Sequence, residues 1–117
     1  MPHLTVEYSL NLATQLDPPK LLEKLHASLK SATGLDMNRV KSRLLPVDQV
    51  LSGEAGSEMQ MIHITLAILS GRDAESRKLY GEILFSELSA FVPPARLPYT
   101  SLTVEIREMD KAAYFRN

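Results

Sequence analysis

The stretch MQMIHITLAIL (residues 59–69) alternates in a way that predicts the central strand of a β-sheet. Four large apolar residues share one of its faces, namely Ile62, Ile64, Leu66 and Ile68. The opposite face carries Met59, Met61, His63, Thr65 and Ala67. Because the residues on both faces are largely apolar or small, we expect both faces of this strand to be covered in the folded protein.

A shorter copy of this pattern occurs near the start of the chain. PHLTV (residues 2–6) lies sixty positions before IHITL (residues 62–66), and both contain His, an apolar residue, Thr and a second apolar residue. The match indicates two related halves, at about residues 2–45 and 58–108, within a single domain over residues 1–117.

Each half is predicted to hold one helix between two strands. Asp17 followed by two prolines is typical of a helix start, and Gly34 is typical of a helix end. Pro93 and Pro94 end the second helix. The predicted helices cover residues 18–33 and about 73–91, and the predicted strands cover residues 2–9, 39–45, 59–69 and 101–108. A long surface loop at residues 46–57 joins the two halves.

This order of elements predicts an α+β fold built from a tandem β-α-β repeat. Because β-α-β crossovers are right-handed, both helices should lie on one face of a four-stranded mixed sheet. The other face, which we expect to be rich in Met and Ile, would then be bare, and soluble monomers seldom expose such a patch. We therefore predict that other copies of the chain cover it.

Composition narrows the class of function. The chain has 13 Lys and Arg against 14 Asp and Glu, so no basic bias favours a nucleic-acid partner. No apolar run is long enough to span a membrane, and no secretory signal is evident, so we expect a cytoplasmic protein. Cysteine is absent, which excludes catalytic thiols, and the sequence lacks a Gly-rich phosphate loop and a metal-spaced cluster of His, Asp and Glu.

The start of the chain offers an unusual base. Methionine ahead of a small residue such as Pro2 is commonly removed, which would leave a free secondary amine. The reference pKa of an α-amino group is about 7.7–8.0, and burial or nearby cations would lower it. Such a base suits proton abstraction from carbon next to a carbonyl. A simpler interpretation is that Pro2 only occupies a strand end, where proline is tolerated.

Three cationic residues favour a carboxylate site. Arg72 follows the strand at residues 59–69, where α/β sheets tend to place ligands, and Gly71 lets the backbone turn just before a helix N-terminus. Lys41 and Arg43 lie two residues apart on a predicted strand and so share one face. Arginine binds carboxylates through two points, although each of these residues could instead be an ordinary solvated charge.

The chain also resembles a known family. It is similar to the 5-carboxymethyl-2-hydroxymuconate delta-isomerase family of the tautomerase superfamily in PHLTVEYS (2–9), VKSRL (40–44), HITLAILSGRDAESR (63–77) and GEILF (81–85). The resemblance implies a tandem β-α-β fold that assembles as a trimer. It also implies that neither a metal nor an organic cofactor takes part.

The resemblance implies a role for each candidate residue. Pro2 matches the N-terminal proline that shuttles the proton, and Arg72 matches an arginine that binds a substrate carboxylate. The family uses a further arginine on the second strand, where this chain has Lys41, with Arg43 two residues on, and the sequence leaves open which of them fills that role. The implied substrate is a small carboxylated 2-hydroxymuconate-type acid from the breakdown of aromatic acids.

Two alternatives remain at this point. The same proline and arginines could serve another reaction of the superfamily, such as arylpyruvate tautomerisation or hydration of an unsaturated acid. The chain could also be a non-catalytic trimeric binding scaffold. A retained Met1 would favour the scaffold, because the nitrogen of Pro2 would then be an amide without basicity.

Overall fold

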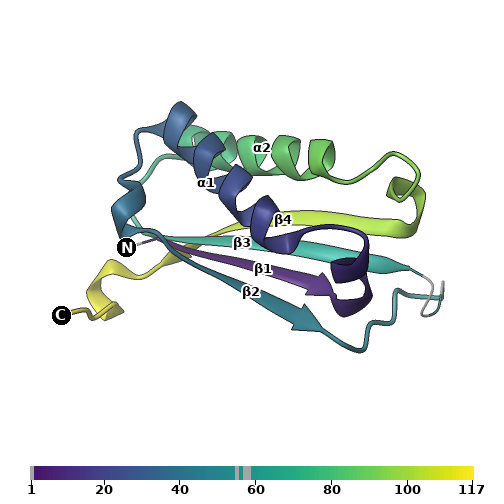
Figure 1. Cartoon of the computed structure of the whole chain (residues 1–117). Coiled ribbons are helices and arrows are strands. Elements are labelled where there is room, and N and C mark those ends of the chain that lie inside the picture. Colours follow the sequence, from purple (N-terminus) through teal and green to yellow (C-terminus); the bar gives the residue numbers. More distant parts are fainter. Residues whose placement is uncertain (1, 55, 57–58) are drawn as a thin grey trace.

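The computed structural model describes residues 2–54, 56 and 59–117. Part of the predicted loop at residues 46–57 therefore lies outside the described residues. The main elements are β1 (His3–Ser9), α1 (Pro18–Thr33), β2 (Lys41–Val47), β3 (Gln60–Leu69), α2 (Ala74–Phe91) and β4 (Thr100–Met109). Figure 1 shows the two helices side by side above one face of the sheet, as the sequence predicts.

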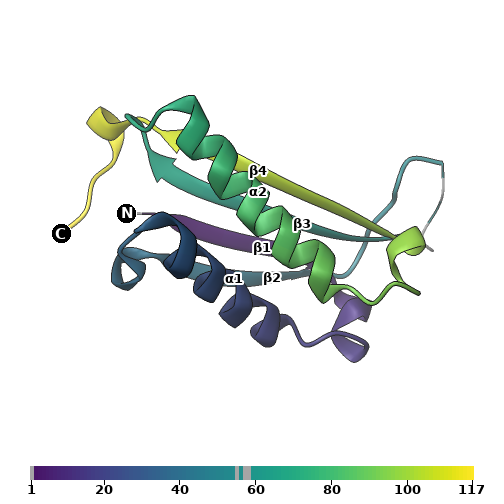
Figure 2. The same cartoon turned by 90° about the horizontal axis from the view of Figure 1, so that it is seen from above.

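The sheet has the predicted mixed topology. Its strand order is β2-β1-β3-β4, with β1 parallel to β2, β3 parallel to β4, and β1 antiparallel to β3. Viewed from above, each helix runs along its own half of the sheet (Figure 2). In the register, His3 lies opposite Lys41 on one side and Ala67 on the other. The start of β1 is therefore held between two strands at one end of the sheet.

Capping hydrogen bonds fix where the two helices begin, and a glycine ends the first of them. The Asp17 carboxylate accepts a hydrogen bond from the Lys20 backbone at 3.2 Å, and Gly34 ends α1 with φ 71°, a conformation that favours glycine. Asp73 caps α2 in the same way through the Ser76 backbone at 2.8 Å. Between the helices and the sheet lies the core, whose fully buried members include Leu4, Val6, Leu25, Leu29, Ile62, Ile64, Leu66, Ile68, Leu84 and Leu88.

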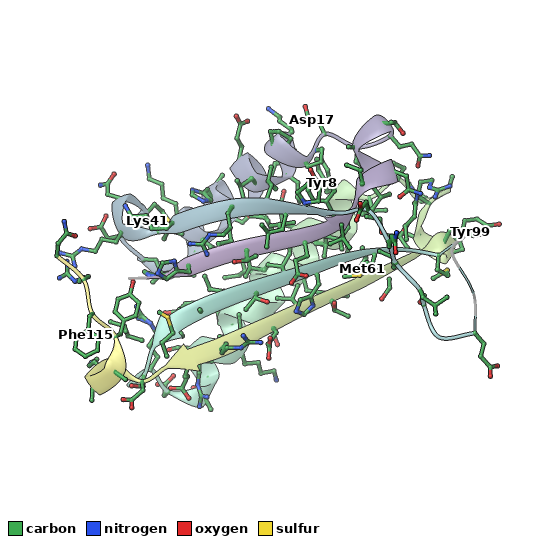
Figure 3. All side chains as sticks on the ribbon, turned by 90° about the horizontal axis from the view of Figure 1, so that it is seen from below. Tyr8, Asp17, Lys41, Met61, Tyr99 and Phe115 are labelled. Carbon is green, nitrogen blue, oxygen red and sulfur yellow. The ribbon has the colours of Figure 1, made fainter. Side chains whose placement is uncertain are left out.

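The sheet face that turns away from the helices, called the open face below, differs from the prediction. All the isoleucines of β3 face the helices, so the expectation that the bare face is rich in Ile is wrong, whereas Met61 does lie on that face as expected. Figure 3 looks onto the open face and labels Met61 and Lys41 there. Strand alternation places the following side chains on it: His3, Thr5, Glu7, Lys41, Arg43, Met61, His63, Thr65, Ala67, Thr103, Glu105 and Arg107.

The second strand is shifted from its predicted place at residues 39–45. It begins at Lys41, because Met37–Arg39 forms a short 3-10 turn, and it continues through Pro46 to Val47. Proline is tolerated there because β2 lies at the edge of the sheet. None of the helices in the described part of the chain is long and apolar enough to cross a membrane.

Candidate active site

Pro2 is buried at the end of the sheet where β1 begins. Its carbonyl oxygen accepts a hydrogen bond from the Lys41 backbone at 3.0 Å, which extends the pairing of β1 with β2 by one residue. The position of Pro2 is thus fixed by the sheet, and its nitrogen lies just beyond the last paired residue.

A pocket of about 240 Å³ opens at this end of the molecule. Its lining comes from the residue before β1, the end of α1 and the segment that follows, the β3–α2 turn and α2 itself, and consists of Pro2, Thr33, Gly34, Leu35, Asp36, Arg39, Arg72 and Tyr80. Pro2 and Arg72, two of the four residues singled out in the sequence, therefore line one pocket although they are distant in sequence.

Arg72 is held by a tyrosine beneath it. The hydroxyl of Tyr80 lies 3.5 Å from an Arg72 guanidinium nitrogen, and the guanidinium carbon lies 5.7 Å from the centre of the tyrosine ring. Tyr80 is only 6% exposed, whereas Arg72 is exposed. A cation over an aromatic face is attracted to it, so Tyr80 gives a long, mobile side chain a preferred position.

Arg72 also borders a second cavity, of about 310 Å³, which it shares with Leu69, Ser70, Gly71 and Lys111. Gly71 has φ 120°, a backbone conformation that other residues rarely adopt. This glycine makes the turn that brings Arg72 round to the pocket, which agrees with the role expected for it from the sequence.

Lys41 and Arg43 lie elsewhere. Both side chains share one face of β2, as predicted, but that face is the open face, whereas Ser42 between them bonds to His26 of α1 on the helix side. Arg43 lies 2.8 Å from the His3 ring and donates to the Thr5 hydroxyl at 3.3 Å. Neither cation is among the described residues that line the pocket with Pro2.

Three lining residues were missed by sequence reasoning. The sequence predicts that Arg39 begins the second strand, at residues 39–45, whereas in the structure it lies in the turn before β2. Asp36 and Arg39 are three apart, a spacing typical of an ion pair on a helical turn, and this signal was available. Tyr80 has the helical spacing of a core residue of α2, and its ring is buried while its hydroxyl reaches Arg72.

His3 predicts a pH dependence of stability. Burial, followed by positive charges that include Arg43 and Lys41, lowers the pKa of His3 below its ordinary 6.5. The unfolded chain therefore takes up this proton first as the pH falls, so the free energy of unfolding should decrease below about pH 6.5. Urea unfolding at pH 8 and pH 5 should show a smaller decrease for His3→Gln than for the wild-type protein. Equal decreases would contradict this assignment.

The described residues contain no group of three or more His, Cys, Asp or Glu side chains placed to hold a metal ion. What the pocket offers instead is two guanidinium groups, one carboxylate, a phenol and the start of β1. Such a set can bind an anionic ligand, and a free amine at Pro2 would add a base.

Comparison with known proteins gives a consistent result. Residues 2–117 match the family described as 5-carboxymethyl-2-hydroxymuconate isomerase. A 5-carboxymethyl-2-hydroxymuconate Delta-isomerase from Escherichia coli is 32% identical over 118 residues, which cover 99% of this chain and 93% of that protein.

Solved structures agree with this result. The crystal structure of a 5-carboxymethyl-2-hydroxymuconate isomerase from Deinococcus radiodurans R1 is 27% identical, with a TM-score of 0.88 over 99% of this chain and 88% of the other. A "fused 4-OT wild type symmetric trimer" shares the fold, with a TM-score of 0.74 over 98% of this chain and 93% of the other, at 13% identity. The chain therefore belongs to the 5-carboxymethyl-2-hydroxymuconate isomerase family, and it is an isomerase with a tautomerase fold.

Proposed function

We propose that the protein moves a proton within an unsaturated, carboxylated 2-hydroxymuconate-type acid, with the amine of Pro2 as the base. The observation that carries this proposal is the shared pocket of Pro2 and Arg72 in a chain of this isomerase family. Nothing in the proposed reaction requires oxidation, reduction or group transfer, so it needs only a base, an anion site and a pocket that limits access of water.

In the proposed mechanism, Met1 is removed and the Pro2 nitrogen is a neutral secondary amine. This nitrogen takes the enol proton, or one from carbon, and returns a proton further along the conjugated system. Arg72 binds a carboxylate and stabilises the negative charge that develops on the dienolate. Tyr80 holds Arg72 in place, and no step passes through a cofactor.

The surroundings of Pro2 suit this role. The residue is buried, and two arginines, Arg39 and Arg72, line its pocket. Burial and nearby positive charge both disfavour a protonated amine, so we expect the pKa of Pro2 to lie below the reference range of about 7.7–8.0. A larger fraction of the enzyme is then in the basic form at neutral pH.

We also propose that the chain assembles as a trimer through the open face. The support is the incomplete burial of that face, together with the trimeric arrangement named for the fused 4-OT protein of similar fold. Light scattering at low micromolar concentration should give three times the 13.1 kDa of one chain. A monomer at that concentration would exclude the trimer.

The predicted substrate role of Lys41 and Arg43 depends on this assembly. On the open face, either cation meets a substrate only if copies of the chain come together to complete a pocket there. Their role therefore stays a prediction.

The proposed reaction is tested by following 5-carboxymethyl-2-hydroxymuconate in the ultraviolet, where the conjugated dienol absorbs. We expect saturable turnover by protein whose N-terminus is Pro2. Turnover only of the enol form of an arylpyruvate, or only hydration of an unsaturated acid, would favour the other reactions of the superfamily. Binding of these acids without turnover would favour a scaffold. A cytoplasmic location and a place in aromatic acid breakdown belong to the same proposal.

A further inference from the structure

The pocket contains a cation that the family resemblance does not account for. The resemblance places a second carboxylate anchor on the second strand, yet Lys41 and Arg43 lie on the open face. Arg39, in contrast, lines the pocket together with Pro2 and Arg72. We propose that Arg39 is the second carboxylate anchor of this pocket, and that Arg39 and Arg72 together select acids with two carboxylates. This inference rests on the proposed function for the identity of the site.

The turn before β2 explains how Arg39 reaches the pocket. In Met37–Arg39, the Asp36 carboxylate accepts from the Asn38 backbone at 3.1 Å, and the Asp36 carbonyl accepts from the Arg39 backbone at 3.0 Å. The strand begins only at Lys41. Arg39 is therefore outside the alternation that sends Lys41 and Arg43 to the open face, and its side chain lies on the pocket side instead.

Asp36 also orients the guanidinium group of Arg39. One carboxylate oxygen of Asp36 caps the turn, and the other lies 3.4 Å from Nε of Arg39. Within the described part of the chain, the two terminal guanidinium nitrogens of Arg39 make no hydrogen bond to another side chain, and the closest approach to Asp36 is through Nε. These nitrogens form the fork that binds a carboxylate in two-point fashion. Asp36 therefore fixes the direction of the fork without occupying it.

The pocket presents two guanidinium groups, from Arg39 and Arg72, and so offers two separate contacts to a ligand with two carboxylates. Arg39, Arg72 and Asp36 together carry a net charge of +1. A ligand with one carboxylate would pair with Arg72, and Arg39 would then pair only with Asp36. A second carboxylate on the same molecule would meet the fork of Arg39. The volume of about 240 Å³ suits a small acid, since pockets for drug-sized ligands hold about 300–1,000 Å³.

The experiment compares two probes that differ in one carboxylate, adipate and hexanoate. Their dissociation constants are measured by calorimetry for the wild-type protein and for Arg39→Gln. We expect the wild-type protein to bind adipate more tightly than hexanoate. In Arg39→Gln the affinity for adipate should fall by about 10- to 100-fold, the effect of losing one charge-assisted pair, while that for hexanoate changes by less than about 3-fold. Arg39→Lys keeps the charge and loses the fork, so its affinity for adipate should lie between those of the wild-type protein and Arg39→Gln.

Lys20→Gln is the matched control. Lys20 and Glu23 form an ion pair with the same three-residue spacing, at 3.6 Å, and the Lys20 side chain is 56% exposed against 57% for Arg39. Lys20 lies at the other end of α1, outside the pocket lining. Its substitution removes a comparable surface cation and should leave both affinities unchanged.

The inference is overturned if the wild-type protein does not prefer adipate, or if Arg39→Gln binds both probes as the wild-type protein does. It is also overturned if Lys41→Gln, rather than Arg39→Gln, causes the adipate-selective loss. Because these measurements need no turnover, they stand apart from the proposed reaction. An inactive protein that shows the adipate-selective loss would refute the reaction and support the role of Arg39.

Discussion

Pro2→Ala is expected to lower kcat by about 10²–10⁴-fold, the usual contribution of a positioned general base, while the protein still folds. The substitution replaces a rigid secondary amine with a more mobile primary amine. The fold should persist because β1 is held by its backbone, and the carbonyl at position 2 still accepts from Lys41. Steady-state kinetics on 5-carboxymethyl-2-hydroxymuconate measures the loss.

Two controls make this result interpretable. The melting temperature of the variant and its number of chains per assembly, from light scattering, should match those of the wild-type protein. Such a match shows that the loss is chemical. Intact mass should show that both proteins start at residue 2. Turnover at the wild-type rate by such a verified Pro2→Ala protein would remove the proposed mechanism and leave Pro2 as a strand-end residue.

Arg72→Ala is expected to lower kcat/KM by about 10- to 100-fold on carboxylated substrates, mostly through a raised KM. The loss is expected because Arg72 lines the pocket of Pro2 and is the proposed anion site, while the proposed base is untouched. Arg72→Lys should recover part of the loss, since it restores the charge without the fork. Kinetics on the same substrate over a wide concentration range separates KM from kcat.

Arg77→Gln serves as the control for Arg72. Arg77 is on the first turns of α2 and pairs with Glu108 at 2.8 Å, away from the pocket lining. We expect the KM of the Arg77→Gln variant to equal that of the wild-type protein. If Arg72→Ala changed only the melting temperature and left KM unaltered, Arg72 would be a structural residue and the anion site would have to lie elsewhere.

The fold was predictable because its signals are local. Asp17, the prolines after it and Gly34 set both ends of α1, and period-two alternation set the faces of β3. The boundary of β2 was wrong for the same reason, because Arg39 keeps the strand period although its backbone is in a turn. The signal that separates the two is Asp36, whose carboxylate caps this turn through the Asn38 backbone.

The candidate site was predictable only in part. Pro2 stands out because it directly precedes β1 and could present a terminal amine, and Arg72 because it closely follows β3, where α/β sheets tend to place ligands. Tyr80 has the helical spacing of a core residue, and its second role depends on a contact with Arg72 that no spacing encodes. Alternation predicts that Lys41 and Arg43 share one face of β2. It does not predict where the pocket lies relative to that face.

The most direct test of the central claim changes only the nitrogen of Pro2. One protein sample begins at Pro2, and a second carries one additional residue that is not removed, so that the nitrogen becomes an amide; intact mass verifies both. If Pro2 is the base, the extended protein should lose at least about 10²-fold in kcat on 5-carboxymethyl-2-hydroxymuconate, with its melting temperature preserved. Equal kcat for the two samples would contradict the claim that the amine of Pro2 performs the proton transfer.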